Sequence, residues 1–201
     1  MLTRLTLIGA LALVLPTLAS AQGPAAAPHE AGPAVVVFAN GGGGSPLSNL
    51  NDAGTADFKT GWSVGGGAGV QVNQYLAIRG VFDYLRSEGE ESSIAFAGQH
   101  INNYFYGGDL QLRYPTASGF APYLLAGAGA VTINNKDDAT FNSFTKFAGK
   151  GGLGLEYAFP NNGAGIFVQG TSYIYKFDQG GFDKTQYDIL WTAGLSYRFG
   201  H

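Results

Sequence analysis

The segment that decides the fold is Asp188-Ile-Leu-Trp-Thr-Ala-Gly-Leu-Ser-Tyr-Arg-Phe199, near the C-terminal end of the sequence. Its odd-numbered positions carry apolar side chains such as Trp191 and Tyr197, whereas its even-numbered positions are mostly small or polar. Because successive side chains of a β-strand point to opposite faces, this alternation predicts a strand with one apolar face. The rest of the chain decides whether that face packs in a protein core or against lipid.

The composition argues against an ordinary water-facing surface. Of the 201 residues only 12% are charged, which is about half the share of a typical soluble domain, while 32 are glycine. Beyond the N-terminus no run of about 18 apolar residues occurs, so no transmembrane helix is expected. The net charge of −3, with no basic block, argues against nucleic acid as a partner. The absence of cysteine excludes disulfides, thiolate metal sites and cysteine nucleophiles.

The first 21 residues predict a cleavable secretory signal peptide. Arg4 supplies the positive charge, residues 5–18 supply the apolar core, and the small residues 19–21 form the cleavage signal. The mature chain then begins at Gln22, and residues 22–33, which are rich in proline and alanine, are expected to form a flexible periplasmic lead-in. The folded domain is therefore expected at residues 34–199.

From residue 34 onward, stretches of strand length alternate with segments rich in Gly, Asn, Asp, Ser and Pro. The expected strands are residues 34–42, 58–72, 75–87, 100–114, 121–134, 144–159, 164–177 and 187–199. Most are longer than the strands of soluble sheets and long enough to cross a bilayer. Short connections such as 73–74 alternate with long polar ones such as 88–99. This sorting predicts an all-β, eight-stranded antiparallel up-and-down transmembrane β-barrel, with its short turns in the periplasm.

Aromatic residues lie near the strand ends on the apolar faces, where the interfacial girdles of a membrane barrel belong. The predicted girdle residues are Trp62, Tyr84, Tyr104, Tyr114, Tyr123, Tyr157, Phe159, Trp191, Tyr197 and Phe199. In the expected strands at 34–42 and 121–134 both faces are apolar or small, so the sequence leaves their outward faces open.

The opposite strand faces carry small residues and a few charges, four of each sign. The predicted lumen charges are Arg79, Asp83, Asp109, Arg113, Lys150, Glu156, Asp188 and Arg198. An eight-stranded barrel has an interior that side chains just fill, and an unpaired charge there is costly. We therefore predict a paired network that plugs the lumen and includes Arg79, Asp109 and Glu156. The alternative is a gated ion path.

The signal peptide, the eight expected strands, the one-sided long loops and the aromatic last strand together resemble the small OmpA/OmpX-type outer-membrane β-barrels, often grouped as porin-family outer membrane proteins. The resemblance implies the outer membrane of a Gram-negative-type cell, contact with membrane lipids and lipopolysaccharide, insertion by the outer-membrane assembly machinery, and a monomer. The family barrel usually ends on an aromatic residue, whereas here Gly200 and His201 follow Phe199.

Signatures of catalysis are weak. His100 follows a segment containing Glu90, Ser92 and Ser93, which suggests at most a lipid-modifying enzyme at the outer rim, and no spacing enforces a triad. We therefore expect no catalytic residue, no metal site and no cofactor. The favoured function is structural or surface-interactive, with loops displayed for adhesion, envelope integrity or binding of an unidentified extracellular ligand. Transport of small or apolar solutes is the alternative.

Overall fold

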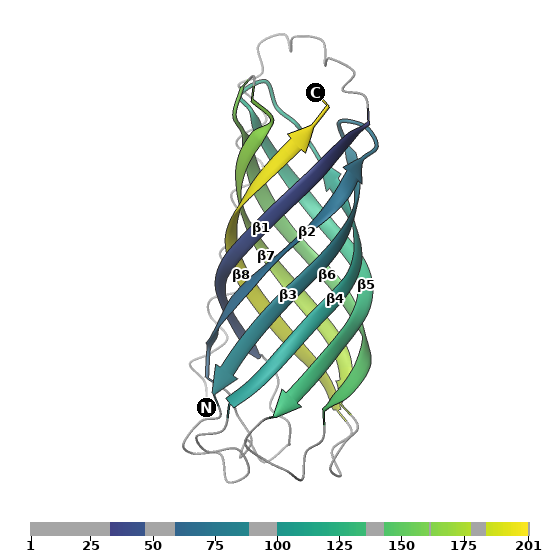
Figure 1. The fold of residues 1–201 in the computed structure, drawn as a ribbon, viewed down its shortest axis with the longest axis vertical. Coiled ribbons are helices and arrows are strands. Elements are labelled where there is room, and N and C mark those ends of the chain that lie inside the picture. The colour runs from purple at the N-terminus through teal and green to yellow at the C-terminus, as the bar shows by residue number, and fades with distance from the viewer. Residues whose placement is uncertain are drawn as a thin grey trace, which may run out of the picture.

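The computed structural model describes residues 33–46, 59–88, 100–135, 143–160, 162–177 and 184–200, which form a closed β-barrel (Figure 1). Its strands are β1 (Ala34–Pro46), β2 (Gly61–Gln71), β3 (Leu76–Glu88), β4 (His100–Arg113), β5 (Phe120–Asn135), β6 (Phe144–Ala158), β7 (Ala164–Phe177) and β8 (Lys184–Phe199). Each strand pairs antiparallel with its neighbours in sequence. The predicted all-β, eight-stranded up-and-down barrel is confirmed.

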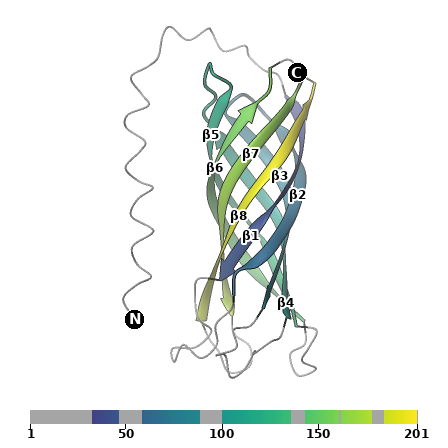
Figure 2. The same ribbon diagram turned by 90° about the vertical axis from the view of Figure 1, so that its left-hand side faces the viewer.

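Closure is made by the first and last strands. Val35 of β1 pairs with Phe199 of β8, and the ladder continues to the pair of Pro46 and Asp188. Figure 2 shows β8 running between β1 and β7. Because every strand has a partner on both sides, the sheet has no open edge, which is the condition for a β-structure within a hydrocarbon layer.

Three short turns join the strands at one end of the barrel, which we call the turn end; the opposite end is the loop end. In the first turn Asn73 Oδ1 accepts hydrogen bonds from the backbone N–H of Tyr75 and Leu76, at 2.8 and 2.9 Å. In the other two turns Gly119 and Gly163 have φ angles of 85° and 68°, which glycine adopts without the steric penalty of a Cβ. Tight turns at one end match the predicted sorting of short and long connections.

Three strands differ from their predicted bounds by at least three residues at the loop end, and one of them is β2, which was expected from residue 58 and begins at Gly61. The first strand was expected to end at residue 42, within the glycine run 41–44, yet β1 continues to Pro46. Gly42 pairs with Ser63 of β2 and Thr192 of β8, and a Cβ there would lie 2.9 Å from Thr192 Cα. Glycine therefore permits close approach of the backbones here instead of ending the strand. β8 begins at Lys184, three residues before its predicted start at 187.

The outer wall is apolar and the lumen is polar. Large apolar side chains are widely exposed outside, as with Leu124 (61%) and Leu195 (66%), whereas most lumen charges are at most 8% exposed. The two faces left open by the sequence are now assigned, because Val35 and Val37 of β1 and Leu124 of β5 point outward. This distribution inverts that of a soluble barrel and matches a barrel in lipid.

No helix in the described part of the chain is long and apolar enough to span a membrane. The predicted signal peptide (1–21) and lead-in as far as residue 32 lie outside the described residues, as does His201. The same is true of Glu90, Ser92 and Ser93.

Candidate functional site: the charged lumen

The central cluster of the lumen is built from Arg79, Asp83, Asp109, Lys150 and Tyr173. Arg79 and Asp109 stand directly opposite each other on β3 and β4, and the Arg79 Nε and Nη2 donate to the two Asp109 oxygens at 2.7 and 3.0 Å. Lys150 Nζ donates to Asp109 Oδ2 at 2.8 Å and lies 3.8 Å from Asp83 Oδ2. The Tyr173 hydroxyl donates to Asp83 from across the barrel. The positive charges of Arg79 and Lys150 therefore equal in number the negative charges of Asp83 and Asp109.

The turn-end cluster contains Gln71, Arg113, Glu156, Ser196 and Arg198. Arg113 Nη2 lies 3.0 Å from Glu156 Oε2, and Arg198 Nη2 donates to Glu156 Oε1. Gln71 Oε1 accepts from both arginines, at 3.0 and 2.8 Å. The Ser196 hydroxyl donates to Glu156 Oε1 at 2.6 Å. One carboxylate thus holds two guanidinium groups, and the cluster carries one excess positive charge.

Asp188 lies on the loop-end side of the central cluster, where it is the direct register partner of Tyr173. It is 1% exposed and accepts hydrogen bonds from the Tyr175 hydroxyl at 3.0 Å and from Asn103 Nδ2 at 3.5 Å. Among the described residues no cation lies within ion-pair distance of it. Among the described residues Asp188 is therefore held by neutral groups alone, whereas Asp83, Asp109 and Glu156 each have an ion pair.

Buried apolar side chains lie in the lumen beside these polar groups. One buried cluster lies toward the loop end and consists of Leu85, Ile101, Phe105, Val131, Ile133, Ala148, Tyr173, Tyr175 and Leu190. In it the rings of Phe105 and Tyr173 stack with centroids 4.0 Å apart. A second cluster consists of Phe38, Val81, Tyr123, Leu125 and Phe167. The Arg79 guanidinium lies 4.7 Å above the Phe38 ring centroid, which joins this cluster to the central charges.

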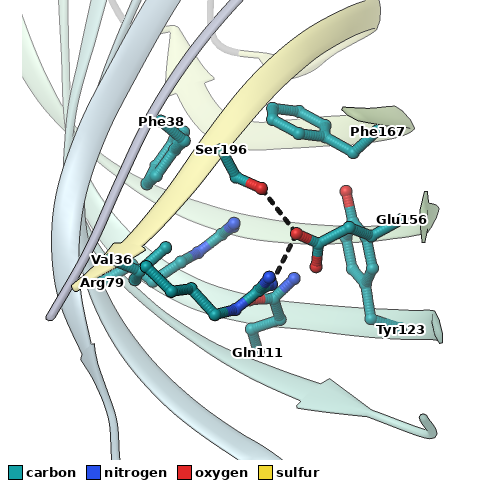
Figure 3. Close-up of a pocket in the computed structure, with 9 residues that line it drawn as sticks. Val36, Phe38, Arg79, Gln111, Tyr123, Glu156, Phe167 and Ser196 are labelled. Carbon is teal, nitrogen blue, oxygen red and sulfur yellow. Dashed lines mark hydrogen bonds and ion pairs between the residues drawn. The ribbon is translucent and has the colours of Figure 1, made fainter. Parts of the chain in front are cut away.

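A small cavity lies beside the turn-end cluster (Figure 3). It is lined by Val36, Phe38, Arg79, Gln111, Tyr123, Glu156, Phe167, Ser196 and Arg198. Figure 3 shows the Ser196 hydroxyl directed at the Glu156 carboxylate. The cavity volume of about 10 Å³ is enough for a single water molecule.

The structure divides seven of the eight predicted lumen charges between two clusters and leaves Asp188 outside both ion-pair networks. All eight predicted lumen charges point inward, and Arg198, at the turn end, has a side chain that is 12% exposed. Arg79 and Asp109 are brought together, but Glu156 pairs with Arg113 and Arg198 instead of joining them. The reason is the register, because Glu156 pairs with Ala121 at the turn end of β5, whereas Asp109 pairs with Gly127.

The assignment of Tyr123 to the outer aromatic girdle is wrong. Tyr123 is 4% exposed and donates from its hydroxyl to Gln169 Oε1 at 3.1 Å inside the lumen. It pairs with Arg113 on one side and Gly154 on the other, and the missing side chain of Gly154 leaves room for the ring. Directly paired residues share a face, so an inward Arg113 requires an inward Tyr123.

The other predicted girdle aromatics lie on the outer wall. At the turn end Tyr157 and Phe159 are in edge-to-face contact with ring centroids 5.4 Å apart, and Tyr197 and Phe199 are 4.7 Å apart. Tyr114 is 60% exposed at the same end. The remaining members, toward the loop end or in mid-wall, are Trp62, Tyr84, Tyr104 and Trp191.

The described residues hold no group of three His, Asp or Glu side chains that could bind a metal ion. His100 begins β4, with Nδ1 3.4 Å from Glu88 Oε1. The serines predicted near His100 lie outside the described residues.

Several lumen partners were missed by the sequence analysis, namely Gln71, Asn103, Tyr173, Tyr175 and Ser196. The signal that identifies them is the alternation of inward and outward residues along each strand. For example, Tyr173 and Tyr175 alternate with the outward residue Ile174, which is 43% exposed. Most of their bonds join strands that are not neighbours, as from β7 to β3, whereas the Tyr175 hydroxyl bonds to Asp188 of the neighbouring strand β8. No pattern within one strand contains such contacts.

Comparison with known proteins agrees with this architecture. A sequence model described as "Outer membrane protein beta-barrel domain" matches residues 10–199. No match was found among curated proteins. Among solved structures, Neisserial surface protein A (NspA) is 17% identical with a TM-score of 0.63, covering 82% of this chain and 97% of NspA.

Two further solved structures have the same fold. The N-terminal β-barrel domain of OprF from Pseudomonas aeruginosa is 15% identical with a TM-score of 0.56, covering 85% of this chain and 100% of that domain. Ail, the attachment invasion locus protein of Yersinia pestis, in complex with the heparin analogue sucrose octasulfate, is 18% identical with a TM-score of 0.51, covering 83% and 99%. Together with the match over nearly the whole sequence, the closed barrel with its apolar outer wall shows that this chain belongs to the outer membrane protein beta-barrel domain family.

Proposed function

We propose that this protein is a closed outer-membrane barrel, exported through a cleavable signal peptide, that presents its loop end to a partner outside the cell. The observation that supports the proposal is the packing of the lumen, in which two clusters of buried apolar side chains lie beside the charged clusters, and the cavity next to the turn-end cluster has a volume of about 10 Å³. A barrel without an open path acts through its exterior. The proposed role is not enzymatic.

Side chains that reach across the lumen support the plug. Tyr173 of β7 bonds to Asp83 of β3, and Asn103 of β4 bonds to Asp188 of β8, so each pair joins opposite walls. A hydrated solute could pass only after these bonds and the ion pairs of Asp109 had been broken, which would expose buried charges without partners. This arrangement favours surface interaction over the transport alternative.

The four segments that connect strands at the loop end are predominantly acidic. Residues 47–58, 89–99, 136–142 and 178–183 together contain eight Asp or Glu and one Lys, a net charge of −7. Opposite charges accelerate encounter and fix the choice of partner. The partner proposed here is therefore a basic protein or peptide surface, in contrast to the sulfated ligand bound to Ail.

Replacing all four segments with short Gly/Ser/Asn linkers is expected to abolish binding of the reconstituted barrel to a basic partner while leaving the barrel folded. Binding to immobilised polylysine and to immobilised heparin would be measured by surface plasmon resonance, with folding followed by heat-modifiable gel migration. The wild type should bind polylysine and not heparin, and its binding should weaken steeply as salt is raised because exposed charges are screened.

The matched control replaces residues 116–118 of a turn at the opposite end with another three-residue turn sequence, which should leave binding unchanged. Binding that survives replacement of all four segments, or stronger binding to heparin than to polylysine, would contradict the proposed role.

A further inference from the structure

One positive charge on the outer wall has no acidic partner among the described residues. Arg86 lies near the loop end of β3 and faces outward, since it alternates with the inward residues Leu85 and Ser87. The other described arginines each pair with a buried lumen carboxylate; they are Arg79, Arg113 and Arg198. Among the residues that the structure describes, Arg86 is thus the arginine with no ion pair. No carboxylate among the described residues is paired with this guanidinium, whose planar fork of donors suits an anion such as phosphate.

Aromatic and hydrogen-bonding side chains surround Arg86. Trp62 of β2 and Asn102 of β4 are its direct partners in register. The Tyr84 ring lies 5.2 Å from that of Trp62 and 5.2 Å from that of Tyr104. The Tyr84 hydroxyl donates to Asn102 Oδ1 at 2.6 Å, and the Asn102 carboxamide also carries two N–H donors. We call these five residues the aromatic shelf.

Toward the middle of the barrel, the wall next to the aromatic shelf is formed by very small residues. Ala68, Gly80 and Gly108 pair in one row across β2, β3 and β4, on the outward faces of their strands. The larger side chains of Phe82 and Ile78 flank Gly80 on the outward face of β3 and are 47% and 53% exposed. An acyl chain can therefore lie close to the wall between them.

We propose that the aromatic shelf binds the phosphate-bearing headgroup of a lipid A-type glycolipid, with an acyl chain against the row of small residues. In barrels of this family the long loops face the cell exterior, so the shelf lies at the level of the outer leaflet, which lipopolysaccharide forms. Tyrosine and tryptophan suit this level because one part of each ring system is apolar and another is polar. Arginine forms charge-assisted, bidentate hydrogen bonds with phosphate. This site serves binding within the bilayer and is separate from the proposed role of the loop segments.

The test measures lipid retained by the intact barrel after reconstitution. The barrel is refolded into phosphatidylcholine vesicles that contain lipid A, extracted in mild detergent, and analysed by native mass spectrometry for bound lipid. The wild type should retain lipid A, and Arg86→Gln should weaken its affinity about tenfold. Arg86→Lys should weaken it less, because the charge remains and only the planar fork is lost.

Lys176→Gln is the matched control. It removes a positive charge from the outward face of β7 near the loop end, four strands away from β3 in the closed order of the barrel. Retention of lipid A should be unchanged in this variant, and all variants should show the same heat-modifiable migration. The loss of affinity in Arg86→Gln should be smaller for lipid A that lacks its phosphates than for intact lipid A. This result would support a contact between Arg86 and a phosphate.

Four results would overturn the proposal. One is equal retention of lipid A by the wild type and Arg86→Gln. Another is an equal loss in Lys176→Gln, which would indicate bulk charge instead of a site. A third is equal retention when phosphatidylglycerol replaces lipid A, which would assign the shelf to ordinary phospholipid. The last is the detection of paired barrels that separate in Arg86→Gln, which would assign the shelf to a second copy of the chain.

Discussion

Asp109→Asn is expected to lower the free energy of unfolding of the barrel by about 3–5 kcal/mol, which is the usual effect of breaking a buried ion pair by removing one partner. Asp109 is 3% exposed and holds both Arg79 and Lys150, at 2.7 and 2.8 Å. The neutral amide of the variant can still accept a hydrogen bond, but Arg79 then has no ion pair among the described residues beyond its contact with the Phe38 ring, and Lys150 keeps Asp83 at 3.8 Å. The measurement is a urea titration of the barrel in detergent or vesicles, followed by tryptophan fluorescence and by heat-modifiable migration.

Asp188→Asn is the matched control for this prediction. Asp188 is as deeply buried, at 1% exposed, but accepts bonds from Tyr175 and Asn103 and pairs with no described cation. Removing its charge leaves no cation stranded and should leave the free energy of unfolding unchanged or raise it. Equal losses of unfolding free energy in the two variants would show that the ion pairs of Asp109 are not the source of its contribution to stability.

Glu156→Gln is expected to destabilise the barrel by a similar amount, about 3–5 kcal/mol, because two guanidinium groups would lose their carboxylate together. Arg113 and Arg198 would then have no carboxylate among the described residues, would still share Gln71 Oε1 at 3.0 and 2.8 Å, and would repel each other. The same urea titration measures the change.

Two further variants isolate the charge effect at Glu156. Ser196→Ala removes one hydrogen bond to the same carboxylate and should cost only about 1 kcal/mol. Adding Arg198→Met to Glu156→Gln removes one stranded cation, so the double variant should be more stable than Glu156→Gln alone. A double variant whose loss is the sum of the two single losses would count against the coupled cluster.

The architecture was predictable because it rests on a period of two. Alternation in residues 188–199, the lengths of the strands and the sorting of short and long connections each follow from local sequence, and the closed order of strands agrees with them. The inward orientation of charged residues such as Arg79 and Asp109 was also predictable, since a charge on the lipid-facing surface would destabilise the barrel.

Where both faces of a strand carry similar side chains, the sequence does not show which face points into the lumen. In β5 the residues around Tyr123 are apolar or tiny on both sides, so an aromatic residue near the strand end resembled a girdle residue. The glycine run of β1 misled for a different reason, because glycine marks loops in most chains but here fits between closely approaching strands at Gly42. Both errors concern contacts with neighbouring strands, which a single strand does not reveal.

The partners within the lumen could not be predicted for a geometric reason. Arg79 and Asp109 pair because the register of adjacent strands sets them opposite each other, whereas Glu156 meets Arg198 of β8 across β7. The shear of the barrel, which is the stagger of the hydrogen-bond register around it, determines which residues of distant strands lie at the same height. A one-step change of register would alter every such pairing, and sequence alone leaves it undetermined.

The central claim is that the lumen is closed by its own side chains, and single-channel recording in planar bilayers tests it most directly. Purified wild-type barrel, shown to be folded by heat-modifiable migration, should insert without producing stable conductance steps in 1 M KCl. Stable, sizeable conductance from the folded wild-type barrel would contradict a lumen filled by the clusters around Asp109 and Glu156.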